Sequence, residues 1–312
     1  MTQQTLADLV EGRRPFITDG GMETTLIFLE GIDLPQFAAF PLLDDAAGRS
    51  ALAGYYRPYL DIAERDGVGI VVDTPTYRAS PDWARLVGYE GDALTAVQHR
   101  SVEFVRALCA ERDGVVTVLD GLIGQRGDGY VVKNAMSTSE AADYHMPQIR
   151  AFGEAGVDMV LAATMGYVEE AIGIAEASAL ASVPVVVSFT VETDGRLPSG
   201  QSLGEAIQAT DAATGSGPLY YMINCAHPSH FRQVLEDGGA WVHRIGGIRA
   251  NASRMSHAEL DNAAALDRGE PDALASDYLA LRPLLPGLRV VGGCCGTDHE
   301  HVSRISAAFH KL

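Results

Sequence analysis

The sequence predicts an α/β fold, a single-domain (β/α)₈ TIM barrel that takes in residues 1–312, and three observations support it. Eight short apolar runs, rich in β-branched residues and without strict alternation, are typical of parallel strands buried on both faces. Between these runs, apolar residues recur every three or four positions, and the segments end in Gly or Asp-Gly as helices do. The length also suits eight strand–helix units, for which about 250 residues plus insertions are usual.

The predicted strands are short and follow one another at regular intervals; they occupy residues 15–20, 68–74, 115–121, 157–164, 183–190, 219–225, 241–247 and 288–295. Helical spacing is clearest between them in residues 51–67, 96–114 and 169–183. The stretch 248–276 is polar and irregular, so we expect it to form the excursion between the seventh and eighth strands.

Composition and charge restrict the function. The chain has 41 acidic and 23 basic residues, a net charge of −18, and no Lys/Arg cluster, so nucleic acid is not an expected partner. No basic segment followed by an apolar one opens the chain, and no apolar run reaches the roughly 18 residues of a membrane helix, so we expect a cytoplasmic protein without membrane association. Small molecules are the expected partners, and the oligomeric state stays open, a homo-oligomer included.

Sulfur side chains gather where predicted strands end, which is where the active sites of such barrels lie. Cys225 ends the sixth predicted strand, and Cys294 and Cys295 end the eighth. Cys109 instead lies within a helical pattern, so we expect an inert core thiol there. Because the strand ends of a closed barrel converge on one mouth, the other three cysteines can meet around one ion.

Three thiolates suit zinc, and three protein ligands leave its fourth position open, as in catalytic sites. Cys294 and Cys295 can face one ion only if the backbone leaves β geometry, which Gly292, Gly293 and Gly296 permit. A metal-free cysteine pair and a structural zinc are the alternatives. An open zinc with three anionic sulfurs is a poor Lewis acid but binds a substrate thiol as thiolate, which favours alkyl transfer to sulfur.

Six motifs now identify a relationship: "TDGGMETTL", "VVDTPTYRAS", "GLIGQRGDGY", "SFTVETDGRLPSGQSL", "INCAHP" and "GGCCGTDHEHV" resemble, in this order, the homocysteine S-methyltransferase family of zinc-dependent thiol methyltransferases. The resemblance covers essentially the whole chain. It implies a (β/α)₈ barrel with Cys225, Cys294 and Cys295 as catalytic and zinc-binding residues, and methyl transfer to homocysteine, giving methionine. Seventeen residues follow Cys295, so we expect a free sulfonium donor, S-methylmethionine or S-adenosylmethionine, in place of a cobalamin-bound methyl group.

The resemblance also implies substrate-binding residues. Asp19 and Thr76 match motif positions that lie at the amino acid substrate in relatives. A turn or cap is the alternative role for Asp19, and a buried hydroxyl is the alternative for Thr76. Asn224 could orient a ligand or the backbone beside Cys225.

One position departs from the family pattern. Relatives carry Glu-Thr at the end of the fourth strand, where the carboxylate pairs with the ammonium group of homocysteine, but this sequence has Ala163-Thr164. Either Glu23 or Glu192 takes over this role, or the acceptor is a different thiol without an amino acid head, since a buried unpaired ammonium is costly. A non-catalytic zinc- or thiol-binding barrel is the third interpretation.

Histidines offer a competing function, that of a metal-dependent barrel hydrolase. His299 and His301 form an H-x-H pattern, but they follow the eighth predicted strand, where we expect Asp298 to cap the last helix. His227 and His230 follow Cys225, and we expect surface or capping roles for them. The cysteine ligands also argue against a hydrolase.

Overall fold

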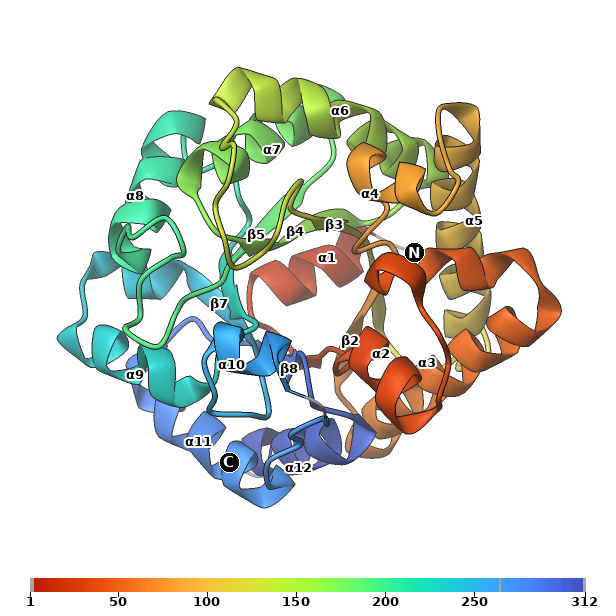
Figure 1. Cartoon of the computed structure of the whole chain (residues 1–312). Coiled ribbons are helices and arrows are strands. Elements are labelled where there is room, and N and C mark those ends of the chain that lie inside the picture. Colours follow the sequence, from red (N-terminus) through yellow and green to blue (C-terminus); the bar gives the residue numbers. More distant parts are fainter. Residues whose placement is uncertain (1–2, 264, 311–312) are drawn as a thin grey trace.

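The computed structural model describes residues 3–263 and 265–310, and its eight parallel strands close into a barrel in the order β1 to β8. Figure 1 shows the helices arranged around these strands. The predicted fold class is therefore confirmed. The strands are β1 Phe16–Ile17, β2 Gly69–Asp73, β3 Thr117–Gly124, β4 Met159–Met165, β5 Val185–Phe189, β6 Tyr221–Asn224, β7 Ile245–Ala250 and β8 Val290–Gly293.

Helices connect successive strands, and several have clear sequence signals at their ends. Capping boxes at Ser137 and Ser202 begin α6 and α8, and left-handed glycines at 156 and 215 end them. No helix in the described ranges is long and apolar enough to cross a membrane. The α-helices are α1 Gln3–Val10, α2 Met22–Thr24, α3 Ala46–Asp66, α4 Pro81–Leu86, α5 Asp92–Cys109, α6 Thr138–Ala155, α7 Val168–Ala181, α8 Leu203–Thr214, α9 Pro228–Asp237, α10 His257–Asp261, α11 Pro271–Leu281 and α12 His299–His310.

The seventh strand begins and ends later in the structure than the sequence predicts. Residues Ala240–Arg244 form a 3₁₀ helix, and β7 continues to Ala250, three residues beyond the predicted end. Gly246 and Gly247 suggested that end, yet both lie inside the strand. Glycine is needed there for space, because a Cβ at these positions would meet Tyr220 and Met222 at 2.8 Å and 2.6 Å. The predicted excursion 248–276 therefore contributes its first residues to β7, then α10 and the start of α11.

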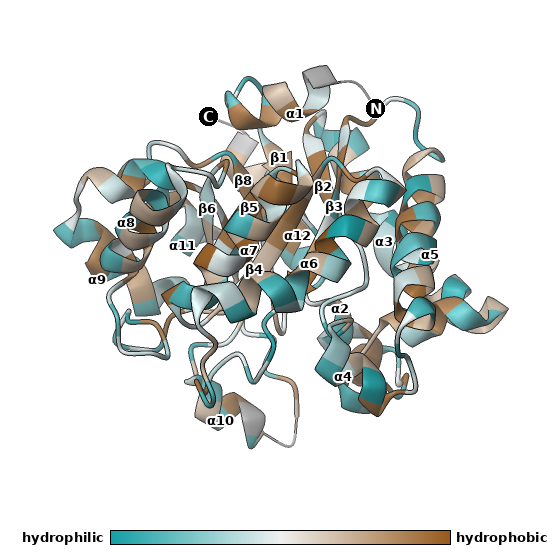
Figure 2. Cartoon of the chain, turned by 90° about the horizontal axis from the view of Figure 1, so that it is seen from above, coloured by the Kyte–Doolittle hydropathy of each residue, from teal (hydrophilic) through white to brown (hydrophobic). Residues whose placement is uncertain are grey.

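The two ends of the barrel differ. Helix α1 covers the amino-terminal end, where Leu9 packs in one apolar cluster with Phe16, Val71 and Val118. Figure 2 shows α1 and the short helix α10 on opposite sides of the barrel. Loops after the strands surround the carboxy-terminal end, which holds a cavity lined by residues from the strand ends and from these loops. The candidate site thus lies where the fold class predicts it.

Candidate thiol and metal site

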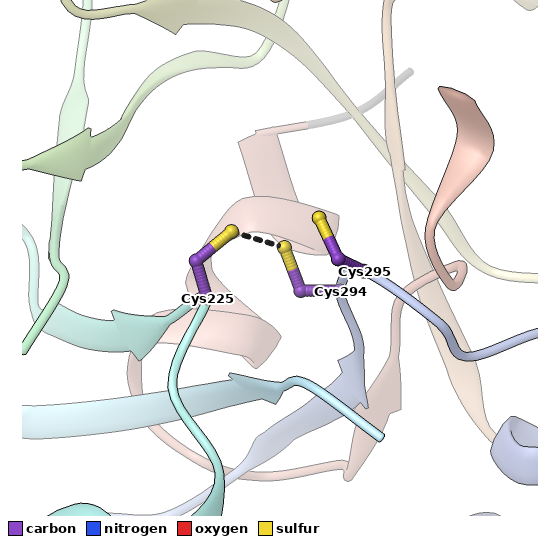
Figure 3. A group of neighbouring side chains, drawn as sticks. All are labelled: Cys225, Cys294 and Cys295. Carbon is purple, nitrogen blue, oxygen red and sulfur yellow. Dashed lines mark hydrogen bonds between the residues drawn. The ribbon is translucent and has the colours of Figure 1, made fainter. Parts of the chain in front are cut away.

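Three cysteines meet at the mouth of the barrel. Cys225 directly follows β6, and Cys294 and Cys295 directly follow β8. Their sulfur atoms all lie within 4.8 Å of one another, and the Sγ atoms of Cys225 and Cys294 are 2.7 Å apart. Figure 3 shows the three side chains directed toward one another from these two strand ends. No other group of three His, Cys, Asp or Glu side chains in the described ranges offers comparable metal-ligand geometry.

The backbone that brings the sulfurs together differs in part from the sequence-based explanation. Cys225 itself adopts a left-handed φ of 53°, and Gly296 has a φ of 79°. The carbonyl of Cys225 accepts hydrogen bonds from Asn251 Nδ2 (3.0 Å) and contacts His257 Nε2 (2.5 Å), which stabilise this uncommon conformation. Gly292 and Gly293 remain in β8, and a Cβ at either would overlap a threonine side chain. Glycine there provides space, whereas Gly296 provides the turn.

The donor set fits zinc. Zn–S bonds of about 2.3 Å in a tetrahedral site place sulfurs roughly 3.8 Å apart, within the span of this cluster. Hydrogen bonds from Cys294 and Cys295 hold the pKa of Cys225 well below its usual range, and the same bond with Cys225 raises the pKa of Cys294 to about 12. Without a cation, the cluster therefore favours one thiolate among three sulfurs. Three thiolates this close repel one another, so a divalent cation is needed to keep all of them deprotonated.

The cluster opens into a cavity of about 440 Å³, a size typical of small-molecule sites. Residues at strand ends form its inner wall, and the loops that follow the strands form its outer wall. The inner wall includes the three cysteines with Asp19, Asp73, Ala163, Asn224 and Arg249. The outer wall includes Phe28, Phe37, Arg78, Asp128 and Tyr130.

Asn224 connects three strand ends beside the cysteine cluster. Its Oδ1 accepts hydrogen bonds from the Thr164 amide (3.0 Å) and the Ser188 hydroxyl (2.6 Å), and its Nδ2 donates to Thr164 Oγ1 (2.8 Å). These bonds join the ends of β4, β5 and β6, and Cys225 is the next residue. Asn224 therefore positions the backbone that carries the first sulfur while also lining the cavity.

Asp19 lies at the inner wall, but it already has partners. Arg249, from β7, forms ion pairs with both Asp19 and Asp73, and Asp19 Oδ2 accepts a hydrogen bond from Tyr55 (3.0 Å). Burial raises the pKa of Asp19 to about 7, although Arg249 opposes the shift. A substrate ammonium would have to share Asp19 with this guanidinium.

A further carboxyl group, that of Asp120, lies beneath this network. Asp120 is fully buried on β3, where the Asp73 carboxyl group is its side-chain partner and no other described residue donates a hydrogen bond to its oxygens. Burial, with the nearby Asp73 carboxylate, raises the pKa of Asp120 well above its usual range. Burial therefore favours the protonated form of Asp120, and Arg249 pairs with the two other carboxyl groups, those of Asp19 and Asp73.

Three other predicted substrate residues lie in different surroundings. Thr76 is fully buried, donates to the Leu122 carbonyl (2.7 Å), and is not among the residues that line the cavity. Glu192 also lies outside the lining, where its Oε1 is 2.9 Å from His257 Nδ1. Glu23 does line the cavity, and burial raises its pKa to about 7. Of the two carboxylates considered as replacements at position 163, only Glu23 faces the cavity.

The histidines of the hydrolase alternative have structural contacts. His301 is buried, and its ring nitrogens lie 2.8 Å from Asp298 Oδ1 and from the Arg268 carbonyl. Asp298 accepts from the Glu300 amide (3.1 Å), so the expected cap of α12 is present. His227 caps α9, and burial lowers its pKa to about 4. His230 contacts the Arg254 carbonyl at 2.9 Å.

Comparison with known proteins places the chain in a family. The family model for homocysteine S-methyltransferase matches residues 16–309. The chain belongs to the homocysteine S-methyltransferase family. The metallated form of the homocysteine methyltransferase MmuM from Escherichia coli superposes with a TM-score of 0.74 at 20% identity, over 97% of this chain and 99% of that one. The oxidized form gives a TM-score of 0.76 at 21% identity and the same coverage. These two structures agree on the fold.

Part of the chain is also similar to part of two much longer proteins. Methionine synthases of Mycobacterium leprae (strain TN) and Mycobacterium tuberculosis (strain ATCC 25618 / H37Rv) are 32% and 31% identical over 135 residues, which are 41% and 42% of this chain. The match covers 10% of each synthase, so the chain spans only a small part of their length. Family membership makes the chain a homocysteine methyltransferase-like enzyme.

The sequence reasoning missed three cavity residues of this enzyme. Arg249 was overlooked because β7 was predicted to end at Gly247, which left Arg249 in an irregular excursion. Arg78 and Tyr130 lie within quoted motifs, but loop residues carry no periodic signal of direction. An arginine directly after a strand-end motif in so lysine-poor a chain was the signal that could have identified Arg78.

Proposed function

We propose that this enzyme transfers a methyl group from a small sulfonium donor, S-methylmethionine or S-adenosylmethionine, to the thiol of homocysteine, giving methionine, and that it uses zinc to do so. The observation that carries the proposal is the cluster of Cys225, Cys294 and Cys295 at the inner wall of a cavity. Free thiols require a reducing compartment, so the proposal includes the cytoplasm.

The chemistry follows from the donor set. Bound zinc would keep the substrate thiol deprotonated and in place as a nucleophile, with the thiol proton released to solvent. The thiolate lone pair forms a bond to the methyl carbon, and the old carbon–sulfur bond breaks so that its electron pair returns to the donor sulfur, which leaves as a neutral thioether. The chain contributes by holding the backbone of Cys225 through Asn224, Asn251 and His257, and by orienting the two substrates in line.

The ammonium group of homocysteine requires a carboxylate partner in the cavity. Homocysteine as the acceptor is favoured by Glu23, because this carboxylate faces the cavity and can pair with the ammonium group. Two observations favour the alternative of a thiol without an ammonium group: Ala163 has no charge, and Asp19 is already paired with Arg249. Glu192 can act on the site only through His257 and the Cys225 carbonyl.

The test compares two cysteine variants of the purified protein. In Cys294→Ala we expect the zinc content, measured by plasma mass spectrometry, to fall from about one ion per chain. We expect the rate of methionine formation to fall by more than about 100-fold, because substitution of residues that merely hydrogen-bond to metal ligands already costs about 10- to 100-fold. Cys109→Ala is the matched control, because Cys109 lies in α5 outside the cavity. Full activity in metal-free protein would contradict the proposal. A zinc-loaded wild type inactive toward a panel of thiols would instead support a non-catalytic barrel.

A further inference from the structure

Arg78 stands at the outer wall of the cavity without a carboxylate partner. It follows β2 in the loop that leads to α4, and it lines the same cavity as the cysteine cluster. Its Nη1 donates a long hydrogen bond to the Gly127 carbonyl (3.3 Å), and its Nε is buried without a partner among the described residues. No ion pair joins it to any carboxylate in the described ranges, although its charge lowers the pKa of Glu23, whereas Arg249 on the inner wall is paired with two carboxylates.

Aromatic contacts hold the guanidinium of Arg78 in place. Its central carbon lies 3.9 Å from the centroid of the Trp83 ring and 5.1 Å from that of Tyr77. Stacking of this kind acts on the faces of the guanidinium plane and does not use the N–H donors of the two Nη groups at its edge. A held guanidinium with free edge donors is suited to a two-point hydrogen bond with a carboxylate.

The position of Arg78 distinguishes the two substrates. The acceptor sulfur must reach the three cysteines at the strand ends, so the acceptor occupies the inner part of the cavity. The donor must approach that sulfur from the side of the loops, where Arg78, Phe28, Phe37 and Tyr130 form the wall. These aromatic rings offer favourable contacts for a sulfonium cation, whereas Arg78 would repel a donor that is only cationic.

We propose that Arg78 binds the carboxylate of the methyl donor, and that the enzyme therefore takes sulfonium carboxylates. The inference rests on the proposed function for the identity of the reaction, but donor binding can be measured without turnover. Arg78 would fix the distal end of the donor while the sulfonium lies against the aromatic residues. It is a specificity-determining residue that does not touch the transferred methyl group.

The experiment measures donor binding to the zinc-loaded protein without acceptor, by equilibrium dialysis. The probes are S-methylmethionine, dimethylsulfoniopropionate, which keeps the carboxylate but lacks the ammonium, and trimethylsulfonium, which lacks both. We expect the wild type to bind the two carboxylates at least 10-fold more tightly than trimethylsulfonium. Arg78→Gln should weaken both by 10-fold or more and leave trimethylsulfonium binding unchanged, and Arg78→Lys should retain part of the affinity. Arg126→Gln is the control, since Arg126 pairs with Asp82 outside this cavity.

Two further outcomes separate this inference from the proposed function. Equal binding of the three probes to the wild type, or an equal loss for all three in Arg78→Gln, would overturn the role of Arg78 even if methyl transfer occurs. In turnover assays with homocysteine, the same variant should raise KM for the donor and leave KM for the acceptor unchanged, and the reverse pattern would also overturn it. Failure to form methionine, with binding as predicted, would count against the proposed reaction alone.

Discussion

The two sides of the inner cavity wall solve opposite electrostatic problems. On one side, Cys225, Cys294 and Cys295 gather sulfurs that can all become anionic, and within the described ranges only the charge of Arg249, which lowers the pKa of Cys294, offsets their repulsion. On the other side, Asp19 and Asp73 already share the guanidinium of Arg249. The sulfur side therefore needs an external cation, whereas the carboxylate side is neutralised from within. The difference supports the proposal that the first side serves the chemistry, whereas the second stabilises the mouth of the barrel.

The largest expected effect on stability comes from removing the arginine of the carboxylate side. Arg249→Met leaves two buried carboxylates without their cation, so we expect the free energy of unfolding to fall by about 3–5 kcal/mol in urea denaturation at pH 7.5. Adding Asp19→Asn and Asp73→Asn to the variant removes the uncompensated charge and should restore most of the loss. Cys294→Ala, on the sulfur side of metal-free protein, should change stability by only about 1 kcal/mol. Similar losses of unfolding free energy in Arg249→Met and Cys294→Ala would contradict the difference between the two sides.

The sequence predicted the cysteine side of the cavity wall but not the carboxylate side. The cysteines were identified because sulfur is rare in the chain and because all three residues directly follow predicted strands. The Arg249 network was not, because its members come from three separate strand ends and none is unusual in its local sequence. Pairing of Asp19 with Arg249 depends on the register of β7, and glycines that make room for neighbouring side chains were mistaken for a strand end.

The substrate residues show a second limit of the sequence. Thr76 lies in a motif matched to the family, yet its side chain is turned into the wall, where it bonds to the Leu122 carbonyl. The barrel itself was predictable because eight apolar runs with intervening helical spacing repeat along the whole chain. Which side of a loop faces a cavity is decided by contacts between distant residues, such as Arg78 with Trp83 and Gly127.

A smaller effect concerns pH and the buried acid of the carboxylate side. Asp120 has a pKa raised above its unfolded value, so the folded chain binds more protons than the unfolded chain from about pH 4 up to the folded pKa. Its contribution to stability is therefore present at low pH and declines as pH rises, by at most about 1.4 kcal/mol per pH unit. Asp120→Asn mimics the protonated acid without titrating.

Thermal or urea unfolding of both proteins between pH 5 and pH 8 checks this expectation. The advantage of Asp120→Asn over the wild type should grow steadily with pH, while activity at pH 7 changes little. Glu111→Gln is a control that should stay flat over this range, because hydrogen bonds to Arg57 lower the pKa of that exposed carboxylate, which confines its pH dependence to below about pH 5. A constant difference between Asp120→Asn and the wild type across the range would show that Asp120 is ionised in the folded chain.

The smallest expected effect concerns the ammonium group of the acceptor. Ala163→Glu introduces a carboxylate at the end of β4, where the side chain lines the cavity near the cysteine cluster. If Glu23 binds the ammonium of homocysteine, Glu23→Gln should raise KM for homocysteine about 5- to 10-fold, as expected for one partly solvated ion pair of about 1 kcal/mol. Ala163→Glu in that background should then recover part of the loss, while KM for 3-mercaptopropionate, which has no ammonium, stays unchanged by Glu23→Gln. An enzyme that prefers 3-mercaptopropionate in the wild-type form, and gains homocysteine activity only with Ala163→Glu, would show that the inner wall is built for a thiol without an amino acid head.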